Sequence, residues 1–130
     1  MQKIKSYRDL QVWQRAVELA VHVYRVTQDF PKSEQYGLTS QMRRAAVSVA
    51  SNIAEGHNRS NKEFGRYLEM ALGSLAELET QIEIALRINY LPEGTYSELN
   101  GELNILGRQL NVLSQRVAST NNQRPATSNQ

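Results

Sequence analysis

A row of apolar residues near the C-terminus constrains the fold more than any other feature, because its spacing alternates between three and four. The row consists of Tyr96, Leu99, Leu103, Leu106, Leu110, Leu113 and Val117. This spacing is typical of the a and d positions of a helix that packs along another helix. It predicts an amphipathic helix over about residues 95–119. From residue 120 to residue 130 the chain is rich in Asn, Gln, Ser and Thr and lacks anchoring apolar groups, which predicts a disordered tail.

Three further segments show helical periodicity, and residues that begin or end helices lie at their ends. These segments span about residues 7–30, 37–56 and 61–90. Ser6 with Asp9 has the spacing of a capping box before the first segment, and Ser60 with Glu63 has it before the third. Gly56 is expected to end the second segment in the left-handed conformation.

Together the four segments predict an all-α fold, an antiparallel up-down-up-down four-helix bundle over residues 7–119, because short connections favour antiparallel neighbours. Residues 1–6 are a basic N-terminal segment ahead of the bundle. A chain of 130 residues can bury a core as one domain. It contains no apolar run of about 18 residues, so no membrane association is expected. Its N-terminus lacks the apolar stretch of a secretory signal, so we expect a cytoplasmic location.

The first two helices carry more apolar surface than one buried stripe requires. On the first helix, the stripe predicted to face the core comprises Leu10, Trp13, Ala16, Val17, Ala20 and Tyr24. A second stripe beside it, expected to contact a second neighbouring helix or another subunit, includes Val12, Leu19 and Val23. On the second helix, the face opposite the core holds small residues that allow close approach of another helix: Val47, Ala50, Ser51 and Ala54. We predict an oligomer contact there.

The residue types that catalysis or metal binding would need do not occur in a suitable pattern. Cysteine is absent, which excludes thiol chemistry and thiolate metal sites. His22 and His57 are far apart in sequence, and neither has a second ligand at metal-binding spacing. No Gly-Lys-Ser or Gly-Lys-Thr run follows the glycines, so a phosphate-binding P-loop is not expected. The sequence therefore predicts no catalytic residue, no metal and no cofactor, and an enzyme is the least favoured class.

Positive charge gathers around the connection between the second and third helices. Residues 42–66 hold five basic residues against two acidic ones, whereas residues 67–106 hold one against seven. The candidate nucleic-acid-binding residues are Arg43, Arg44, Arg59, Lys62 and Arg66, with Lys3, Lys5 and Arg8 as a second group. Free backbone N–H groups at the start of the third helix favour anions, so the cluster suits contact with a phosphate backbone. The alternative is a solvated turn with local ion pairs, for example between Arg66 and Glu63.

A continuous run in the second helix, from Leu38 through Arg43-Arg44-Ala45-Ala46 and Ser51-Asn52-Ile53-Ala54 to Gly56, resembles a family signature. Tyr7 to Trp13, Phe64 to Leu68 and Gly73 to Leu78 support it, so the likeness covers about residues 7–118. The chain resembles the four-helix-bundle proteins encoded by intervening sequences in bacterial 23S ribosomal RNA genes.

This resemblance implies a ring-shaped homopentamer without agreed catalytic residues. It also implies a fold shared with the accessory variability protein of diversity-generating retroelements, which binds the reverse transcriptase and nucleic acid through basic surfaces.

Two functional hypotheses follow. The first is a non-catalytic oligomeric scaffold that associates with an RNA or DNA backbone through the basic residues near the turn. The second is a protein-interaction scaffold without its own nucleic-acid binding, such as an accessory subunit for a reverse transcriptase.

Overall fold

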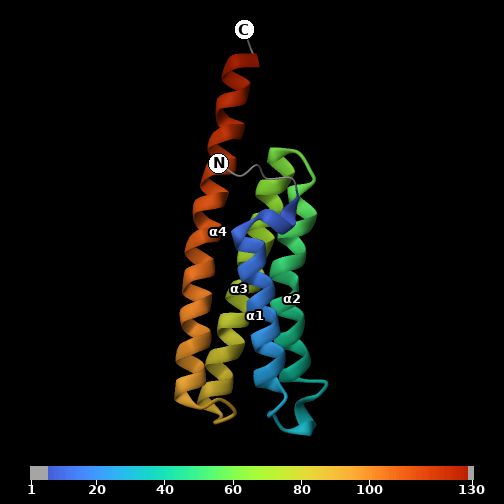
Figure 1. Cartoon of the computed structure of the whole chain (residues 1–130), viewed down its shortest axis with the longest axis vertical. Helices are drawn as coiled ribbons and strands as arrows, with labels where there is room; N and C mark the ends of the chain where they lie inside the picture. The colour runs from blue at the N-terminus through green and yellow to red at the C-terminus, as the bar shows by residue number, and fades with distance from the viewer. Residues whose placement is uncertain (1–5, 129–130) are drawn as a thin grey trace.

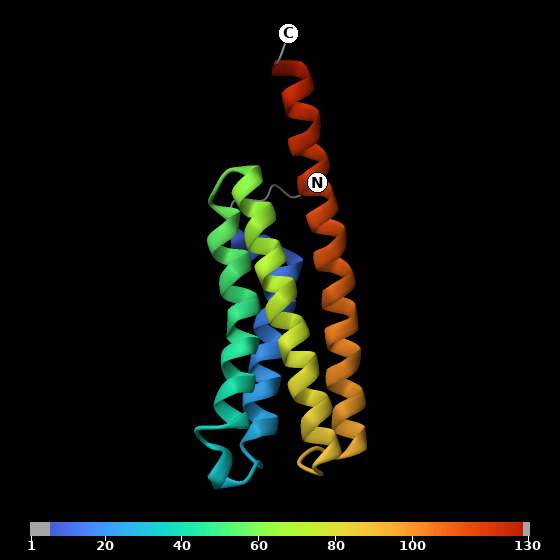
Figure 2. The ribbon, with the colours of Figure 1, turned by 180° about the vertical axis from the view of Figure 1, so that it is seen from behind.

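Four antiparallel α-helices make up the fold of the computed structural model, which describes residues 6–128 and the side chains of residues 6–120 (Figure 1). The helices are α1 (Gln11–Thr27), α2 (Leu38–His57), α3 (Asn61–Arg87) and α4 (Glu93–Ser128), and the short 3-10 turns are η1 (Tyr7–Asp9) and η2 (Lys32–Glu34). Each helix packs against the next along the chain, and α4 packs against α1 (Figures 1 and 2). No strand occurs in the described part of the chain. The predicted all-α, up-down-up-down bundle is confirmed.

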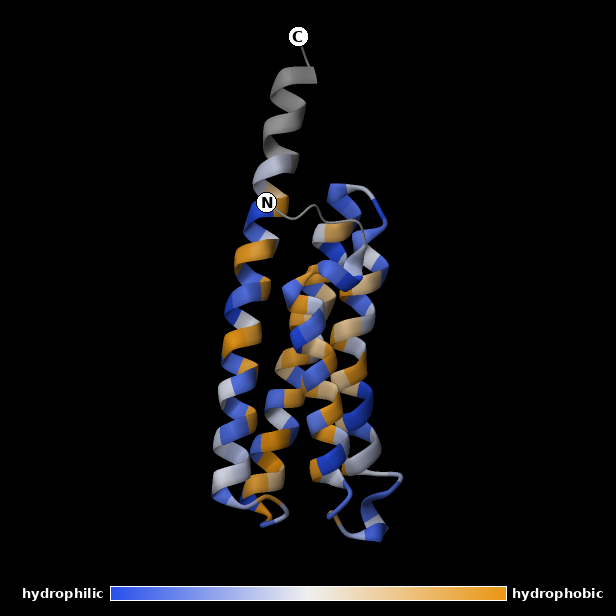
Figure 3. Ribbon diagram, viewed as in Figure 1, coloured by the Kyte–Doolittle hydropathy of each residue, from blue (hydrophilic) through white to orange (hydrophobic). Residues whose placement is uncertain are grey.

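The apolar row of α4 supplies one side of the core, as its spacing predicts. Leu99, Leu103, Leu106 and Leu110 are each at most 1% exposed, and burying one leucine stabilises the fold by about 1.5–3 kcal/mol. In Figure 3 the hydrophobic residues of α4 recur turn by turn. The opposing side chains come from α2 and α3, among them Met42, Ile53, Leu68, Leu78 and Ile82, all at most 1% exposed.

The second apolar stripe of α1 is enclosed in the bundle, whereas the first stripe, apart from the fully buried Ala16, is only partly buried or exposed. Val12, Leu19 and Val23 are 7%, 1% and 0% exposed within the bundle, so they cannot contact another subunit in this structure. Trp13 is only partly buried, and Tyr24 is 43% exposed. The prediction of an oligomer contact at Val12, Leu19 and Val23 is therefore wrong. Two adjacent stripes of similar hydropathy cannot be ranked by periodicity alone, because the positions of α2 and α4 decide which one is enclosed.

The first capping box forms but does not begin α1. The Ser6 side chain accepts a hydrogen bond from the Arg8 N–H, and the Ser6 N–H donates to Asp9. This box caps η1, after which Leu10 is extended (φ −76°, ψ 127°). The helix therefore begins at Gln11, four residues later than expected.

Gly56 has a different role from the predicted left-handed cap. It lies inside α2, and no glycine in the described residues has a positive φ. A Cβ atom at Gly56 would lie 2.5 Å from the Cβ atom of Tyr67, so glycine is needed where α2 crosses α3 closely. The left-handed residue is Asn89 (φ 66°), just after α3.

The fourth helix continues to Ser128, beyond the end of the α2–α3 turn (Figures 1 and 2). A disordered tail was expected from residue 120. Pro125 lies in this extension and has no backbone N–H to donate, but each other residue added to an existing helix can gain a backbone hydrogen bond at little cost. Residues 129–130 of that predicted tail, and residues 1–5 of the basic segment, lie outside the described residues. No helix in the described part is long and apolar enough to cross a membrane.

Candidate functional site

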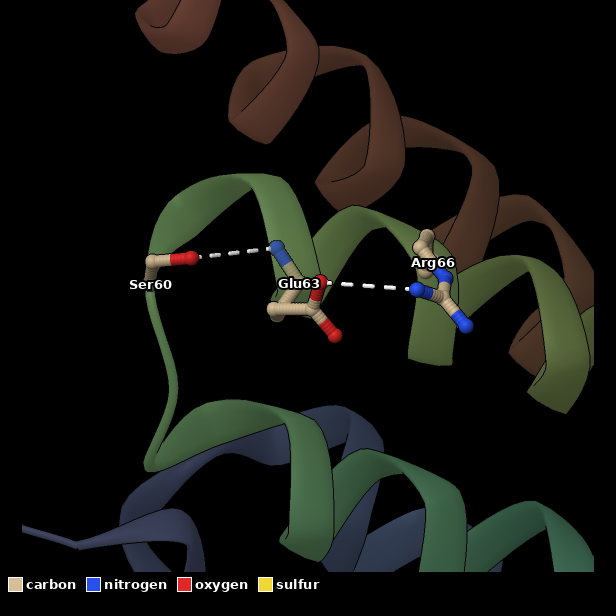
Figure 4. A network of polar contacts seen from close by, with 3 residues as sticks. All are labelled: Ser60, Glu63 and Arg66. Atoms are coloured by element: carbon tan, nitrogen blue, oxygen red, sulfur yellow. Dashed lines mark hydrogen bonds and ion pairs between the residues drawn. The ribbon is translucent and has the colours of Figure 1, made fainter.

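The turn between α2 and α3 presents exposed cations at the start of a long helix. Ser60 caps α3 by accepting a hydrogen bond from the Glu63 N–H at 3.3 Å (Figure 4). The Glu63 carboxylate does not complete the capping box. Instead it lies 3.5 Å from the Arg66 guanidinium, in an exposed pair one turn along the helix (Figure 4). Such pairs contribute about 0–1 kcal/mol, so Arg66 can exchange this partner for a phosphate at little cost.

Arg59 and Lys62 are available for the same kind of contact. The Arg59 guanidinium lies 5.0 Å from the centre of the Tyr67 ring, which holds the arginine by its flat face. Its N–H groups remain at the edge of that plane, where acceptors bind. Lys62 is exposed and makes no ion pair in the described structure. The turn therefore offers three cations beside the positive end of the α3 dipole.

Arg8 lies at this same end of the molecule, because α1 runs antiparallel to α2 and η1 contacts α2. Its guanidinium is 5.3 Å from the Trp13 ring and 5.8 Å from the Tyr7 ring. Lys3 and Lys5, which were grouped with Arg8, lie outside the described residues. Below, "basic end" means the group Arg8, Arg59, Lys62 and Arg66.

Arg43 and Arg44 are not part of the basic end. Arg44 lies thirteen positions before His57, the last residue of α2, which is about 20 Å along a helix. Arg43 is bonded to α1, since its Nε donates to Thr27 Oγ1 at 2.9 Å and its Nη2 donates to the Tyr24 carbonyl at 3.3 Å. The prediction that placed both arginines near the α2–α3 turn is wrong, because a helix of this length carries its two ends far apart.

Two arginines of α4 were missed. Arg108 and Arg116 line an open pocket of about 370 Å³ between the start of α1 and α4. The next residue after Arg116, Val117, approaches within 3.8 Å of a Cβ placed at Gly65 near the start of α3. Arg116 therefore lies near the basic end. The signal was present in the sequence, since residues 107–130 hold three basic residues and no acidic one.

An apolar groove runs between α1 and α2, with a volume of about 560 Å³. Its α2 side consists of Val47, Ala50, Ser51 and Ala54, the residues predicted for an oligomer contact, and its α1 side includes Trp13, Val17 and Tyr24. Val47 and Tyr24 are 41% and 43% exposed, whereas Ala50 is 8% exposed and forms part of the floor. No carboxylate lines the groove. It is referred to below as the α1–α2 groove.

Titratable side chains form structural bonds. His22 Nδ1 lies 2.6 Å from Glu102 Oε2, which joins α1 to α4. The Leu38 N–H and the Tyr90 hydroxyl both bind Glu34 and hold the pKa of its carboxylate below its usual range. Within the described residues, no group of three His, Cys, Asp or Glu side chains could hold a metal ion.

The fold and these surfaces define a four-helix-bundle protein with a basic end and an apolar lateral groove. The family model of the 23S rRNA-intervening sequence protein matches residues 8–112, so the chain belongs to that family. This confirms the family part of the resemblance, while the relation to the retroelement accessory protein stays a prediction.

A solved structure has the same fold. It is a protein of unknown function from the S23 ribosomal protein family of Bacteroides thetaiotaomicron VPI-5482, at 22% identity and a TM-score of 0.72. The match covers 79% of this chain and 97% of that one. No curated protein matches the chain.

Proposed function

We propose that this protein is a non-catalytic, homo-oligomeric scaffold that associates with an RNA or DNA backbone through its basic end. The observation that carries the proposal is the exposed cluster Arg59, Lys62 and Arg66 at the start of α3, where only Arg66 has a carboxylate partner and that pair is 3.5 Å long. Contacts of this kind recognise phosphates without reading the base sequence.

The α1–α2 groove supports the oligomeric part of the proposal. Its small α2 side chains permit close helix approach, and its exposed apolar side chains lose water when another subunit covers them. Five subunits, as the resemblance implies, would present five copies of the basic end. Light scattering on the full chain tests this part, and the mass of a monomer at micromolar concentration would overturn it.

The nucleic-acid part is tested by reversing charge at the turn. In the double variant Arg59→Glu/Lys62→Glu, affinity for a labelled oligonucleotide should fall at least about tenfold, and the slope of log K against log salt should shrink by about 2. The control Lys32→Glu/Arg87→Glu makes the same change in net charge away from the turn, at two exposed positions, and should leave the slope within about 0.5. Equal losses in both variants would mean that only the total charge matters.

The second candidate is a protein-interaction scaffold, such as an accessory subunit for a reverse transcriptase. The α1–α2 groove favours it, since an apolar groove without carboxylates can accept an amphipathic helix. A protein that retains no nucleic acid at low salt, yet loses its partner when Val47→Glu is introduced, would replace the first candidate by the second.

A further inference from the structure

A polar pocket lies at the opposite end of the bundle from the basic end, between the last turns of α1 and the first turns of α2. Its volume is about 460 Å³. The lining consists of two tyrosines, two arginines, three small polar or amide side chains and one valine: Tyr24, Tyr36, Arg43, Arg44, Gln35, Thr39, Ser40 and Val47. No carboxylate lines it. It is called the tyrosine–arginine pocket below.

Both tyrosines expose aromatic surface, but Tyr24 also lines the α1–α2 groove, so Tyr36 is the ring that stays exposed when another subunit covers that groove. Tyr36 lies in the connection before α2 and is 89% exposed, although tyrosine is usually at least partly buried. Tyr24, from α1, is 43% exposed, and the Arg43 guanidinium lies 4.6 Å from its ring centre. Rings of this kind, beside cations, are the stacking platforms on which unpaired bases bind.

The two arginines supply positive charge without a carboxylate partner in the described structure. Arg43 is held in place through its Nε and Nη2 atoms by Thr27 and Tyr24, which leaves Nη1 for another acceptor. Arg44 is exposed and its Nη2 donates to the Gln41 side chain at 3.1 Å, a neutral partner. Arginines without a carboxylate partner at such a site bind phosphate oxygens through charge-assisted hydrogen bonds.

The nearby carboxylate of Glu34 is turned to other partners. It accepts hydrogen bonds from the Leu38 N–H at 3.0 Å and from the Tyr90 hydroxyl at 2.9 Å. Gly37 makes this possible, because a Cβ atom there would lie 2.6 Å from Glu34 Oε1. These bonds fix the connection that carries Tyr36, and Glu34 forms no ion pair with Arg43 or Arg44 in the described structure.

We propose that the tyrosine–arginine pocket binds a short segment of single-stranded nucleic acid, with a base on Tyr36 and neighbouring phosphates on Arg43 and Arg44. A single strand fits better than a duplex, because only unpaired bases can stack on a side chain. The inference rests on the proposed function for the class of ligand, but the site itself is separate from the basic end. It also gives a role to the two arginines that the α2–α3 turn does not include.

Fluorescence anisotropy with the full chain and a labelled 12-nucleotide single strand, as RNA and as DNA of the same sequence, tests the pocket. Tyr36→Ala should weaken binding by about 5- to 100-fold, the effect of losing one stacked base. Tyr36→Phe keeps the ring and should bind within about twofold of the parent chain. Since Tyr36 is 89% exposed, circular dichroism should show the same helix content in all three proteins.

The comparison with Arg59→Glu/Lys62→Glu separates this inference from the proposed function. If Tyr36→Ala binds the strand like the parent chain while the double variant loses affinity, the tyrosine–arginine pocket is overturned and the basic end is supported. If Tyr36→Ala loses affinity while the double variant binds like the parent chain, the tyrosine–arginine pocket is supported and the basic end is overturned as the binding site. If the parent chain binds neither the RNA nor the DNA strand at low salt, both the pocket and the proposed nucleic-acid function are overturned.

Photo-cross-linking locates the strand directly. An oligonucleotide that carries 5-iodouracil should cross-link to a peptide containing Tyr36 or Tyr24, and cross-links confined to residues 59–67 would overturn the pocket. Displacement of the strand by polyglutamate at equal charge concentration would also overturn it, since the pocket would then recognise charge alone.

Discussion

The two ends of the bundle use their charged side chains in different ways. At the basic end, the Arg66–Glu63 pair is 3.5 Å long and Lys62 has no ion partner. At the opposite end, carboxylates accept short hydrogen bonds from tyrosines: Tyr90 donates to Glu34 at 2.9 Å, and Tyr96 donates to Glu83 at 2.8 Å. This group of four residues is called the bonded end below.

This difference distinguishes carboxylates that stabilise the fold from cations that are left for a partner. The bonds of Glu34 and Tyr90 join the α1–α2 connection to the segment after α3, so they hold two connections in register. The cations at the other end make one exposed ion pair and lie against exposed or partly buried rings, so we expect their removal to cost little stability. We infer that the carboxylate–tyrosine bonds stabilise the fold at the bonded end, whereas the cations of the basic end remain available to a partner.

The largest expected effect comes from the packing beneath the basic end. In Gly56→Ala, the new Cβ atom meets the Tyr67 Cβ at 2.5 Å, and a Cβ atom cannot move without its backbone. We expect a net loss of up to about 2 kcal/mol in the free energy of unfolding, because overpacking costs about 1–3 kcal/mol against a helix-propensity gain of about 1 kcal/mol. Urea unfolding followed by circular dichroism measures it.

The matched control is Gly73→Ala on α3, where no atom lies within 4 Å of the added Cβ. That variant should gain up to about 1 kcal/mol, because alanine favours a helix interior over glycine. A Gly56→Ala protein as stable as Gly73→Ala would mean that α2 and α3 do not meet closely. Since Tyr67 supports Arg59, the Gly56 variant should also weaken nucleic-acid binding.

The bonded end should make stability depend on pH in the acid range. The Leu38 N–H and Tyr90 hydroxyl lower the pKa of Glu34, and Arg87 with the Tyr96 hydroxyl lowers the pKa of Glu83. Both groups have lower pKa values folded than unfolded, so their contribution is present above the ordinary value of 4.5 and is lost as pH falls through the folded-state values. Glu34→Gln should therefore flatten the fall in unfolding free energy below pH 4.5.

Tyr90→Phe is the companion variant, because it removes the hydroxyl and leaves the carboxylate. It should be less stable than the parent chain near neutral pH and should also show a shallower acid profile. If the profiles of Glu34→Gln and the parent chain run parallel between pH 6 and pH 3, the carboxylate–tyrosine bonds do not hold this end together.

The fold could be predicted from sequence because its signals are local. The spacing from Tyr96 to Val117 fixes one buried face of α4, and proline, serine and glycine mark the connections. The choice between the two stripes of α1 could not be made in that way. Both are apolar, and only the positions of α2 and α4 determine that Val12, Leu19 and Val23 are enclosed.

The residues of the candidate site were likewise predictable only where the signal is local in sequence. Arg59, Lys62 and Arg66 were identified because neighbours in one turn stay neighbours in space. Arg43 and Arg44 were misplaced, since closeness in sequence was taken for closeness along a helix of 20 residues. The exposure of Tyr36 had no signal at all, because periodicity does not describe a connection.

The smallest expected effect concerns the ion pair at the basic end. Glu63→Gln removes the partner of Arg66 and one negative charge from the first turn of α3. The stability loss should stay below about 1 kcal/mol, since an exposed pair contributes little and the carboxylate also interacts with the helix dipole. Nucleic-acid affinity should rise about two- to fivefold over the parent chain at low salt. Near 0.5 M salt, where exposed charges are screened, the variant and the parent chain should bind equally.

Glu79→Gln, an exposed position further along α3, is the control, and its affinity should change less than that of Glu63→Gln because it lies several turns from the cations. A weaker complex for Glu63→Gln would mean that the pair orients Arg66 toward phosphate instead of occupying it. The basic end would then be a preorganised site rather than a set of free cations, and it would resemble the bonded end in how it fixes its side chains.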